Sequence, residues 1–439
     1  MQAVISPSKL NGTIKAPPSK SAMQRACAAA LIKGGETILH NPGTSADDKA
    51  ALNIIQQLGA IVEYRNDAVV ISSDGINPLS NEINCGESGL SVRMFSSIAA
   101  LADKEITITG SGSLLNRPLK FFDTVFPLLN VECESNKGFL PLTIEGPLQP
   151  KDITIDGSLS SQFLTGLFFA YSAADAENVT ITVNNLKSKP YVDLTLEILE
   201  EFHLQIPKND DYDTFYFKGQ LINYSTDQPF NYTIEGDWSN AAFLLVAGAI
   251  AGDITVSGLK MNSVQGDKSI LDVLRQAGAK FEMKDDAINI AESALQAFTF
   301  DATDCPDLFP PLVALAAHCE GVSTIMGVSR LLHKESNRAI SLQEEFRKMN
   351  VIITVEDDSM IIKGVKEIPT TDIFSHNDHR IAMACAVAGL KTNGTVYIRN
   401  SIAVRKSYPN FFEDLKKLNA NVREEETSFG DVFDSNYWI

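Results

Sequence analysis

Asn377-Asp378-His379-Arg380-Ile381-Ala382-Met383-Ala384-Cys385-Ala386-Val387 is a polar opening of four residues followed by a stretch that is apolar on every side. The same arrangement recurs along the chain at a period of about 70 residues. In each copy a small polar or acidic cluster opens an Ala-rich stretch that passes into a β-branched strand. Such a period indicates a fold built from copies of one unit. The six openings are Ser19-Lys20-Ser21, Glu87-Ser88-Gly89, Ser160-Ser161-Gln162, Asp237-Trp238-Ser239, Asp304-Cys305-Pro306-Asp307 and Asn377-Asp378-His379-Arg380.

Each copy also predicts a second helix and several strands. The first helix is apolar all round, which is typical of a helix in the centre of a domain, whereas the second, as in residues 342–349, alternates charged and apolar residues and keeps one face in water. Strands such as residues 106–109 and 254–256 follow the first helices. The predicted fold class is α/β, with two domains of three repeated βαβαββ-like units, whose buried parallel helices are enclosed by sheets.

The length of the chain predicts how these units are grouped. A chain of 439 residues exceeds the size at which a single core stops growing, and six units divide most simply into three and three. The N-terminal strand, residues 1–16, precedes the first opening, and we expect it to complete the last unit of the C-terminal domain. The predicted domains are residues 1–17 plus 236–439, and residues 18–235. The chain then crosses twice between them, over a cleft that holds the active site.

Composition excludes several classes of partner. The net charge of -18 argues against a nucleic acid or an anionic membrane, because both attract basic surfaces. The longest apolar run, residues 241–252, is too short to span a bilayer, and the N-terminus shows no secretory signal. Six cysteines without Cys-x-x-Cys spacing fit reduced thiols and disfavour a zinc site. We expect a cytoplasmic monomer.

The helix openings are candidates for an anion site. Ser, Asp and Asn cap helix N-termini, where unpaired N–H groups carry a partial charge of roughly +0.5. If the six first helices run parallel, their N-termini converge. Lys20, Arg25, Arg93 and Arg380 add cations within the first turn or two. The ligand is therefore expected to carry phosphate or carboxylate groups.

Each polar segment alone has an ordinary explanation. Lys20 and Arg25 could form a solvated basic turn. Lys334 and Arg338, predicted one turn apart on the same helix face, could belong to a surface ion-pair ladder. His379 could be a capping or core histidine. One segment therefore does not establish a binding site.

The joint pattern is more informative than any single segment. Arg117 and Lys406 each precede a proline-started second helix and could also be exposed, but six such segments at equivalent positions of a repeat favour a functional site. The chain has no Gly-x-x-x-x-Gly-Lys loop, no His-Glu-x-x-His pair and no Gly-x-Ser-x-Gly elbow. No cofactor and no metal are indicated.

These motifs together resemble the enolpyruvyl transferases and, within them, the 5-enolpyruvylshikimate-3-phosphate synthase family. The resemblance covers the chain from end to end, with the family's order and approximate spacing. It implies two domains of three repeats that close on phosphoenolpyruvate and shikimate 3-phosphate, and a reaction through a tetrahedral ketal that releases phosphate without metal or cofactor. The motifs are Pro18-Ser19-Lys20-Ser21 with Arg25, Ser160-Ser161-Gln162-Phe163, Lys189-Pro190-Tyr191, Lys334-Glu335 with Arg338, Asn377-Asp378-His379-Arg380, and the Lys406 segment.

The resemblance also implies roles for individual residues. Asp307 would accept the proton of the acceptor's 5-hydroxyl. Glu335 would act as the acid at the methylene group of phosphoenolpyruvate, and Lys20 would be the third catalytic residue. The implied phosphoenolpyruvate ligands are Lys20, Gly89, Arg117, Gln162, Arg338, Arg380 and Lys406. The implied shikimate 3-phosphate ligands are Lys20, Ser21, Arg25, Ser160, Ser161, Gln162, Ser188, Tyr191, Asp307 and Lys334.

The second opening departs from the commonest family pattern. Many members have Asn-Ala-Gly-Thr there and end the stretch in Arg-Pro, whereas residues 87–94 keep Gly89 and Arg93 but carry Leu90 and Met94 in place of Thr and Pro. The resemblance therefore implies no particular sensitivity to glyphosate, which competes for the phosphoenolpyruvate site that this loop helps to form.

Three alternatives remain open. The related transferase that acts on UDP-N-acetylglucosamine usually has a reactive Cys before an Arg-Pro pair, whereas residues 110–118 contain neither Cys nor Asp. A non-catalytic anion-binding protein of the same fold would gain nothing from two carboxylates, Asp307 and Glu335, in its site. An RNA-end cyclase built from similar repeats would need a basic surface, and the net charge disfavours it.

Overall fold

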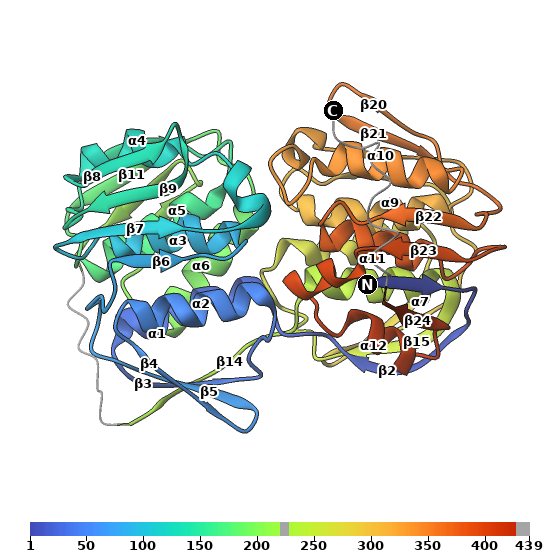
Figure 1. Cartoon of the computed structure of the whole chain (residues 1–439), viewed down its shortest axis with the longest axis horizontal. Coiled ribbons are helices and arrows are strands. Elements are labelled where there is room, and N and C mark those ends of the chain that lie inside the picture. Colours follow the sequence, from blue (N-terminus) through green and yellow to red (C-terminus); the bar gives the residue numbers. More distant parts are fainter. Residues whose placement is uncertain (220–227, 427–439) are drawn as a thin grey trace.

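The computed structural model describes residues 1–219 and 228–426, which form two lobes side by side (Figure 1). Each lobe has its own core of buried apolar side chains. One core draws on residues 22–234. The other joins residues 3–16 to residues 238–422. We call the parts around these cores the first lobe and the second lobe.

Six buried helices follow the six polar openings, as predicted. Side chains cap most of them: for example, Ser19 accepts a hydrogen bond from the Ala22 amide and Asp237 from the Asn240 amide. In the fifth unit a 3-10 turn, η4 (Pro306–Leu308), precedes the helix. The buried helices are α1 (Lys20–Lys33), α3 (Gly89–Ala99), α5 (Ser161–Ala173), α7 (Trp238–Ala251), α9 (Phe309–Ala317) and α11 (His379–Ala388).

The second helices lie nearer the surface and several are preceded or followed by 3-10 turns. Two of them, α4 and α12, begin two residues after Pro118 and Pro409 rather than at the prolines. The second helices are α2 (Ala46–Gln57), α4 (Lys120–Val125), α6 (Lys189–Glu201), α8 (Ile270–Gln276), α10 (Arg338–Lys348) and α12 (Phe411–Lys417). The other 3-10 turns are η1 (Gly112–Asn116), η2 (Phe126–Leu129), η3 (Gly266–Ser269), η5 (Val328–Leu331) and η6 (Ser401–Lys406).

The described strands form six four-stranded sheets, one for each unit. Every sheet has one parallel pair and antiparallel partners beside it. The first lobe holds the sheets β14 (Phe230–Thr233)-β3 (Gly35–His40)-β5 (Ala68–Ser73)-β4 (Ile61–Arg65), β6 (Glu82–Asn84)-β7 (Glu105–Thr109)-β9 (Phe139–Glu145)-β8 (Glu132–Asn136) and β10 (Ile153–Asp156)-β11 (Val179–Asn184)-β13 (Thr214–Phe217)-β12 (Lys208–Asp210). The second lobe holds β16 (Lys280–Lys284)-β17 (Ala287–Ala291)-β15 (Gly252–Ser257)-β2 (Leu10–Lys15), β18 (Thr299–Asp301)-β19 (Val322–Met326)-β21 (Ser359–Lys363)-β20 (Ile353–Glu356) and β22 (Thr371–Phe374)-β23 (Val396–Arg399)-β1 (Gln2–Ile5)-β24 (Val422–Glu425).

The strands before α1 and α7 are exchanged between the lobes. Strand β2 precedes α1 but pairs in parallel with β15, which follows α7. Strand β14 precedes α7 but pairs in parallel with β3, which follows α1. The sheet that follows α1 therefore takes its first strand from the segment before α7, and the sheet that follows α7 takes its first strand from the segment before α1.

The N-terminal segment forms two strands, so the prediction of one strand over residues 1–16 is wrong. Strand β1 lies between β23 and β24 and completes the last unit, as expected, whereas β2 completes the fourth unit. Pro7 lies between the two strands, and a proline cannot donate to a strand ladder.

The two crossings between the lobes lie side by side. Pro18 and Gly236 form an isolated antiparallel bridge. The Asp237 amide donates to the Pro17 carbonyl at 2.8 Å, and the Ser19 amide donates to the Glu235 carbonyl at 2.8 Å. This pair of crossing segments brings the starts of α1 and α7 next to each other.

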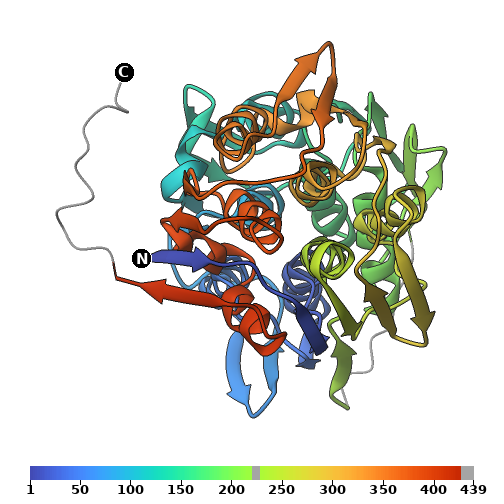
Figure 2. The ribbon, with the colours of Figure 1, turned by 90° about the vertical axis from the view of Figure 1, so that its right-hand side faces the viewer.

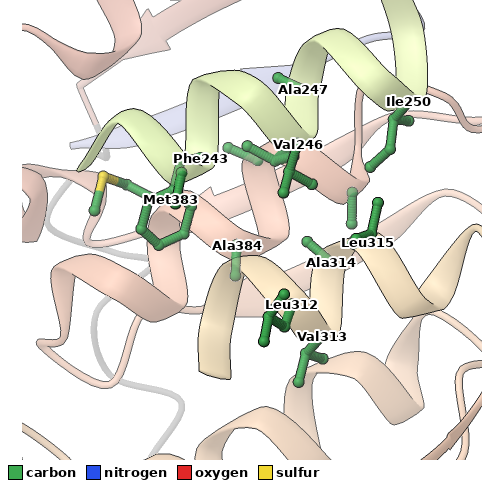
Figure 3. Packing of buried hydrophobic residues seen from close by; sticks show 14 of the residues in the cluster. Phe243, Val246, Ala247, Ile250, Leu312, Val313, Ala314, Leu315, Met383 and Ala384 are labelled. Carbon is green, nitrogen blue, oxygen red and sulfur yellow. The ribbon is translucent and has the colours of Figure 1, made fainter. Parts of the chain in front are cut away.

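The three buried helices of the second lobe pack directly against one another. Phe243 and Val246 of α7, Leu312 of α9, and Met383 of α11 are fully buried and meet at the centre of the lobe (Figure 3). Figure 2 shows this lobe with its helices nearly end-on, so that they run roughly parallel. Parallel packing brings the helix N-termini together at one end of the lobe.

Candidate active site

A cavity of about 380 Å³ lies between the lobes where helix starts from both sides face each other. The first lobe contributes the starts of α1, α3 and α5, and the second lobe contributes η4, η5 and the loop before α10. The predicted site residues that line it are Lys20, Ser21, Arg25, Gly89, Arg117, Ser160, Ser161, Gln162, Ser188, Tyr191, Asp307, Lys334 and Glu335. The other three are not among the lining residues: Arg338 and Arg380 contact the carboxylate of Asp307, and Lys406 pairs with Glu87.

Lys20 is held at the first turn of α1 by carboxylates from both lobes. Its Nζ lies 2.8 Å from Asp47 Oδ2, and its backbone amide donates to Asp237 Oδ2 at 3.0 Å. Burial alone would lower the pKa of Lys20, but Asp47 and Glu335 outweigh burial and raise it. Lys20 is therefore a fixed cation in the cavity wall.

Asp307, in η4, is surrounded by three cations of its own lobe. Its Oδ1 lies 3.1 Å from Lys334 Nζ and 2.8 Å from Arg338 NH1, and its Oδ2 lies 3.2 Å from Arg380 NH2. Burial alone would raise the pKa of Asp307, but Arg380, Lys334 and Arg338 outweigh burial and hold it well below its usual value. The carboxylate is ionised at neutral pH.

Glu335 joins cations from opposite lobes. It contacts Arg338 of the second lobe, and its Oε1 lies 3.1 Å from Arg117 NH2 of the first lobe. Burial alone would raise the pKa of Glu335, but Arg338 and Arg117 hold it well below its usual value. The prediction that Lys334 and Arg338 share a helix face is wrong, because α10 begins only at Arg338; the two cations instead meet at Asp307.

Arg338 is oriented by the cap of another helix. Asp378, the N-cap of α11, accepts hydrogen bonds from Arg338 Nε at 2.8 Å and from the Arg380 amide at 2.9 Å. Asp378 is fully buried and Arg338 is 1% exposed, so each fixes the other. His379 is also buried, and burial lowers its pKa well below the usual value, so it is a neutral core histidine.

The altered opening at residues 87–94 supplies a third contact between the lobes. Glu87 Oε2 lies 2.7 Å from Lys406 Nζ and accepts from the Ser113 amide at 3.1 Å. A Cβ atom at Gly89 would lie 2.4 Å from Arg117 NH1, so glycine lets this guanidinium approach the helix start. Gln162 accepts a hydrogen bond from Arg93 at 2.8 Å, and burial lowers the pKa of Arg93 to about 9.

Arg25 and Tyr191 also line the cavity. Arg25 Nε donates to Thr195 Oγ1 at 2.9 Å, and its NH1 donates to the Ser21 carbonyl at 2.9 Å. The Tyr191 hydroxyl donates to Asp267 Oδ2 at 2.6 Å. Burial lowers the pKa of Arg25 to about 10, which still leaves it charged at pH 7.

Sequence reasoning missed several residues of the site. Asp47, Asp267 and Arg330 received no role, and Asp378 and Glu87 were seen only as parts of helix openings. Two acidic residues at the start of the second helix were a signal for Asp47. Asp267 and Arg330 lie in 3-10 turns without a motif, so the sequence offered no comparable signal for them.

Comparisons with known proteins agree over the whole chain. The family model for EPSP synthase (3-phosphoshikimate 1-carboxyvinyltransferase) matches residues 4–415. The 3-phosphoshikimate 1-carboxyvinyltransferase of Clostridium novyi (strain NT) is 36% identical, covering 96% of this chain and 98% of the relative. That of Methanocorpusculum labreanum is 34% identical, covering 97% of this chain and 100% of the relative.

Solved structures show the same likeness. EPSP synthase from Acinetobacter baumannii superposes with a TM-score of 0.79 at 26% identity, covering 96% of this chain and 100% of that chain. The enolpyruvyl transferase NikO from Streptomyces tendae gives a TM-score of 0.76 at 16% identity, covering 97% and 99%, which indicates the shared fold alone. Within residues 1–219 and 228–426, every helix is too short or too polar to cross a membrane.

Proposed function

The chain belongs to the EPSP synthase family, and from that premise we propose how its cavity transfers the enolpyruvyl group of phosphoenolpyruvate to shikimate 3-phosphate. The chain is an enzyme, a 3-phosphoshikimate 1-carboxyvinyltransferase of the shikimate pathway. One observation carries the residue roles. Two ionised carboxylates, Asp307 and Glu335, lie among cations from both lobes, where a reaction between two polyanions needs both charge and proton transfer.

For the donor, we propose that Arg338 and Arg380 bind the carboxylate of phosphoenolpyruvate. Both guanidinium groups converge on Asp307, and planar guanidinium donors suit a carboxylate. We propose that its phosphate is held by Lys20, Arg117, Gln162, Lys406 and the Gly89 amide. The close approach of Arg117 to Gly89 supports this placement, because it sets a cation beside a helix N-terminus.

For the acceptor, we propose that a second set of cavity residues binds shikimate 3-phosphate. Ser160, Ser161, Ser188 and Lys334 would hold its phosphate. Ser21, Arg25 and Tyr191 would bind its ring carboxylate, and this grouping is supported by Arg25, which donates to the carbonyls of Ser21 and Tyr191. Lys20, Gln162 and Asp307 line the same cavity and complete the proposed ligands of the acceptor.

We propose that substrate binding prepares the two carboxylates for proton transfer. Incoming phosphate and carboxylate groups offset the charge of the cations that hold Asp307 and Glu335 ionised, so both pKa values rise towards a useful range. Glu335, which takes up a proton from solvent as its pKa rises, then gives that proton to the methylene carbon of phosphoenolpyruvate, while Asp307 accepts the proton of the 5-hydroxyl as the hydroxyl oxygen bonds to C2. In the second step the bond from C2 to the phosphate oxygen breaks, Asp307 gives its proton to the departing phosphate, and Glu335 takes a proton back from the methyl group.

We propose two domains, residues 1–17 plus 236–439 and residues 18–235. The two separate cores and the paired crossings at Pro18 and Gly236 support this division. We also propose that the chain acts as a cytoplasmic monomer.

Phosphate release tests the function directly. Purified protein is mixed with phosphoenolpyruvate and shikimate 3-phosphate without added metal, and a parallel reaction contains UDP-N-acetylglucosamine as acceptor. Release with shikimate 3-phosphate alone is expected. Release only with the nucleotide sugar, or none with either acceptor, would contradict the assignment.

A further inference from the structure

Arg330 is a cation of the second lobe whose guanidinium group bonds to the first lobe. It lies in η5 and lines the cavity four residues before Lys334. Its NH1 donates to the carbonyls of Ser158 at 2.8 Å and Leu159 at 3.0 Å, and its NH2 donates to Ser188 Oγ at 3.0 Å. The Arg330 side chain thus forms hydrogen bonds with two separate segments of the first lobe, residues 158–159 and Ser188.

Ser188 is held in an uncommon backbone conformation by groups from the second lobe. Its φ is +59°, in the left-handed region that side chains with a Cβ atom rarely adopt. The Ser188 amide donates to Asp304 Oδ1 at 2.7 Å, and its hydroxyl accepts from Arg330. Conformations of this kind persist where the surroundings impose them, and here the surroundings include both lobes.

The contacts of Arg330 lie on one side of the cavity. Ser158 and Leu159 directly precede Ser160, and Ser188 starts α6; these are the segments that the proposed function assigns to the acceptor's phosphate. None of these three hydrogen bonds reaches a residue assigned to the donor. A planar guanidinium can bridge these three acceptors at once, whereas an ammonium group cannot match that fork.

We propose that Arg330 is a positioning residue that fastens the closed lobes on the acceptor side and sets Ser188 and the 158–160 segment for the phosphate of the acceptor. It therefore determines affinity for shikimate 3-phosphate more than affinity for phosphoenolpyruvate. This inference rests on the proposed function. It goes beyond that function because it adds a specificity determinant that belongs to neither substrate's ligand set.

Calorimetric titration of the full-length protein with shikimate 3-phosphate tests the proposal without requiring turnover. Losing hydrogen bonds made by a charged group is expected to weaken binding by about tenfold to a hundredfold in Arg330→Gln. Arg330→Lys keeps the charge without the fork and should fall between wild type and Arg330→Gln. Arg347→Gln, which removes an exposed guanidinium from the same lobe, is the matched control and should bind as wild type does.

Steady-state kinetics separate positioning from a general structural role. In Arg330→Gln the KM for shikimate 3-phosphate should rise at least ten times more than the KM for phosphoenolpyruvate, with the midpoint of thermal unfolding close to that of wild type. Equal increases of both KM values, or an acceptor affinity within twofold of wild type, would overturn the proposal. If wild type binds the acceptor but releases no phosphate, the proposed function fails while the calorimetric result still decides the role of Arg330. If wild type does not bind the acceptor, both are overturned.

Discussion

Asp307→Asn removes the charge at the centre of the second-lobe cation cluster while keeping the shape of the side chain. Three cations lie within 3.2 Å of the Asp307 carboxylate. The amide cannot accept the proton of the acceptor's hydroxyl. It also ceases to compete, as an anion, for Arg338 and Arg380, which we assign to the carboxylate of phosphoenolpyruvate.

The substitution should therefore slow the chemical step without weakening the binding of phosphoenolpyruvate. A positioned general base typically supplies about 10² to 10⁴ in rate, which corresponds to about 2.7 to 5.4 kcal/mol of transition-state stabilisation at 1.36 kcal/mol per tenfold. We expect kcat to fall by that factor. The KM for phosphoenolpyruvate should stay unchanged or fall, because the two arginines are freed from Asp307.

Rapid-quench single turnovers with both substrates would measure the chemical step, and steady-state kinetics would give both KM values. Asp272→Asn is a matched control, since this exposed carboxylate pairs with Arg275 on the same lobe, away from the cavity. A kcat within tenfold of wild type would refute the role of Asp307 as base. So would a rise in the KM for phosphoenolpyruvate with kcat unchanged, because that pattern is the loss of a binding group.

Three further predictions concern other parts of the site. Glu335→Gln should lower kcat by about 10² to 10⁴ and abolish exchange of the methylene hydrogens of phosphoenolpyruvate with D₂O, measured by NMR; retained exchange would assign that proton transfer elsewhere. Gly89→Ala should displace Arg117 and raise the KM for phosphoenolpyruvate about tenfold to a hundredfold, and an unchanged KM would show that this guanidinium moves aside freely. Burial, with the charge of Asp307, raises the pKa of Asp267 from 3.8 to about 6, so the folded chain binds more protons than the unfolded chain between those pH values and its free energy of unfolding falls as the pH rises through them. Urea denaturation at pH 4 and pH 7 should show Asp267→Asn gaining about 2.5 kcal/mol relative to wild type at the higher pH, and an equal difference between the two proteins at both pH values would contradict the shift.

The helices of this fold could be predicted from the sequence because their signals are local. Capping residues such as Ser19 and Asp237 lie directly before apolar Ala-rich stretches, and both cap as expected. The exchange of β2 and β14 could not be predicted in this way. Both pairings join segments far apart in the sequence, and the two crossing segments pass each other at Pro18 and Gly236.

In the site too, local signals could be predicted from the sequence, whereas contacts between distant segments could not. Repetition of cations at equivalent positions predicted the cluster, but the carboxylate that orients each cation often comes from a distant segment. Asp378 orients Arg338 from forty residues away, and Lys406 pairs with Glu87 of the other lobe. Arg330 carried no signal, because its function depends on carbonyl groups, which every residue possesses.

The position of β1 has a consequence for how the chain is made. All described strands of the first lobe lie within residues 35–233, so these strands can pair once the ribosome has passed β14. Strand β1 must instead wait for β23 and β24, which are the described strands furthest from it along the chain. Pairing of such distant segments is slow, so the last sheet of the second lobe forms after the first lobe has all its described strands available, and β1 stays unpaired until then.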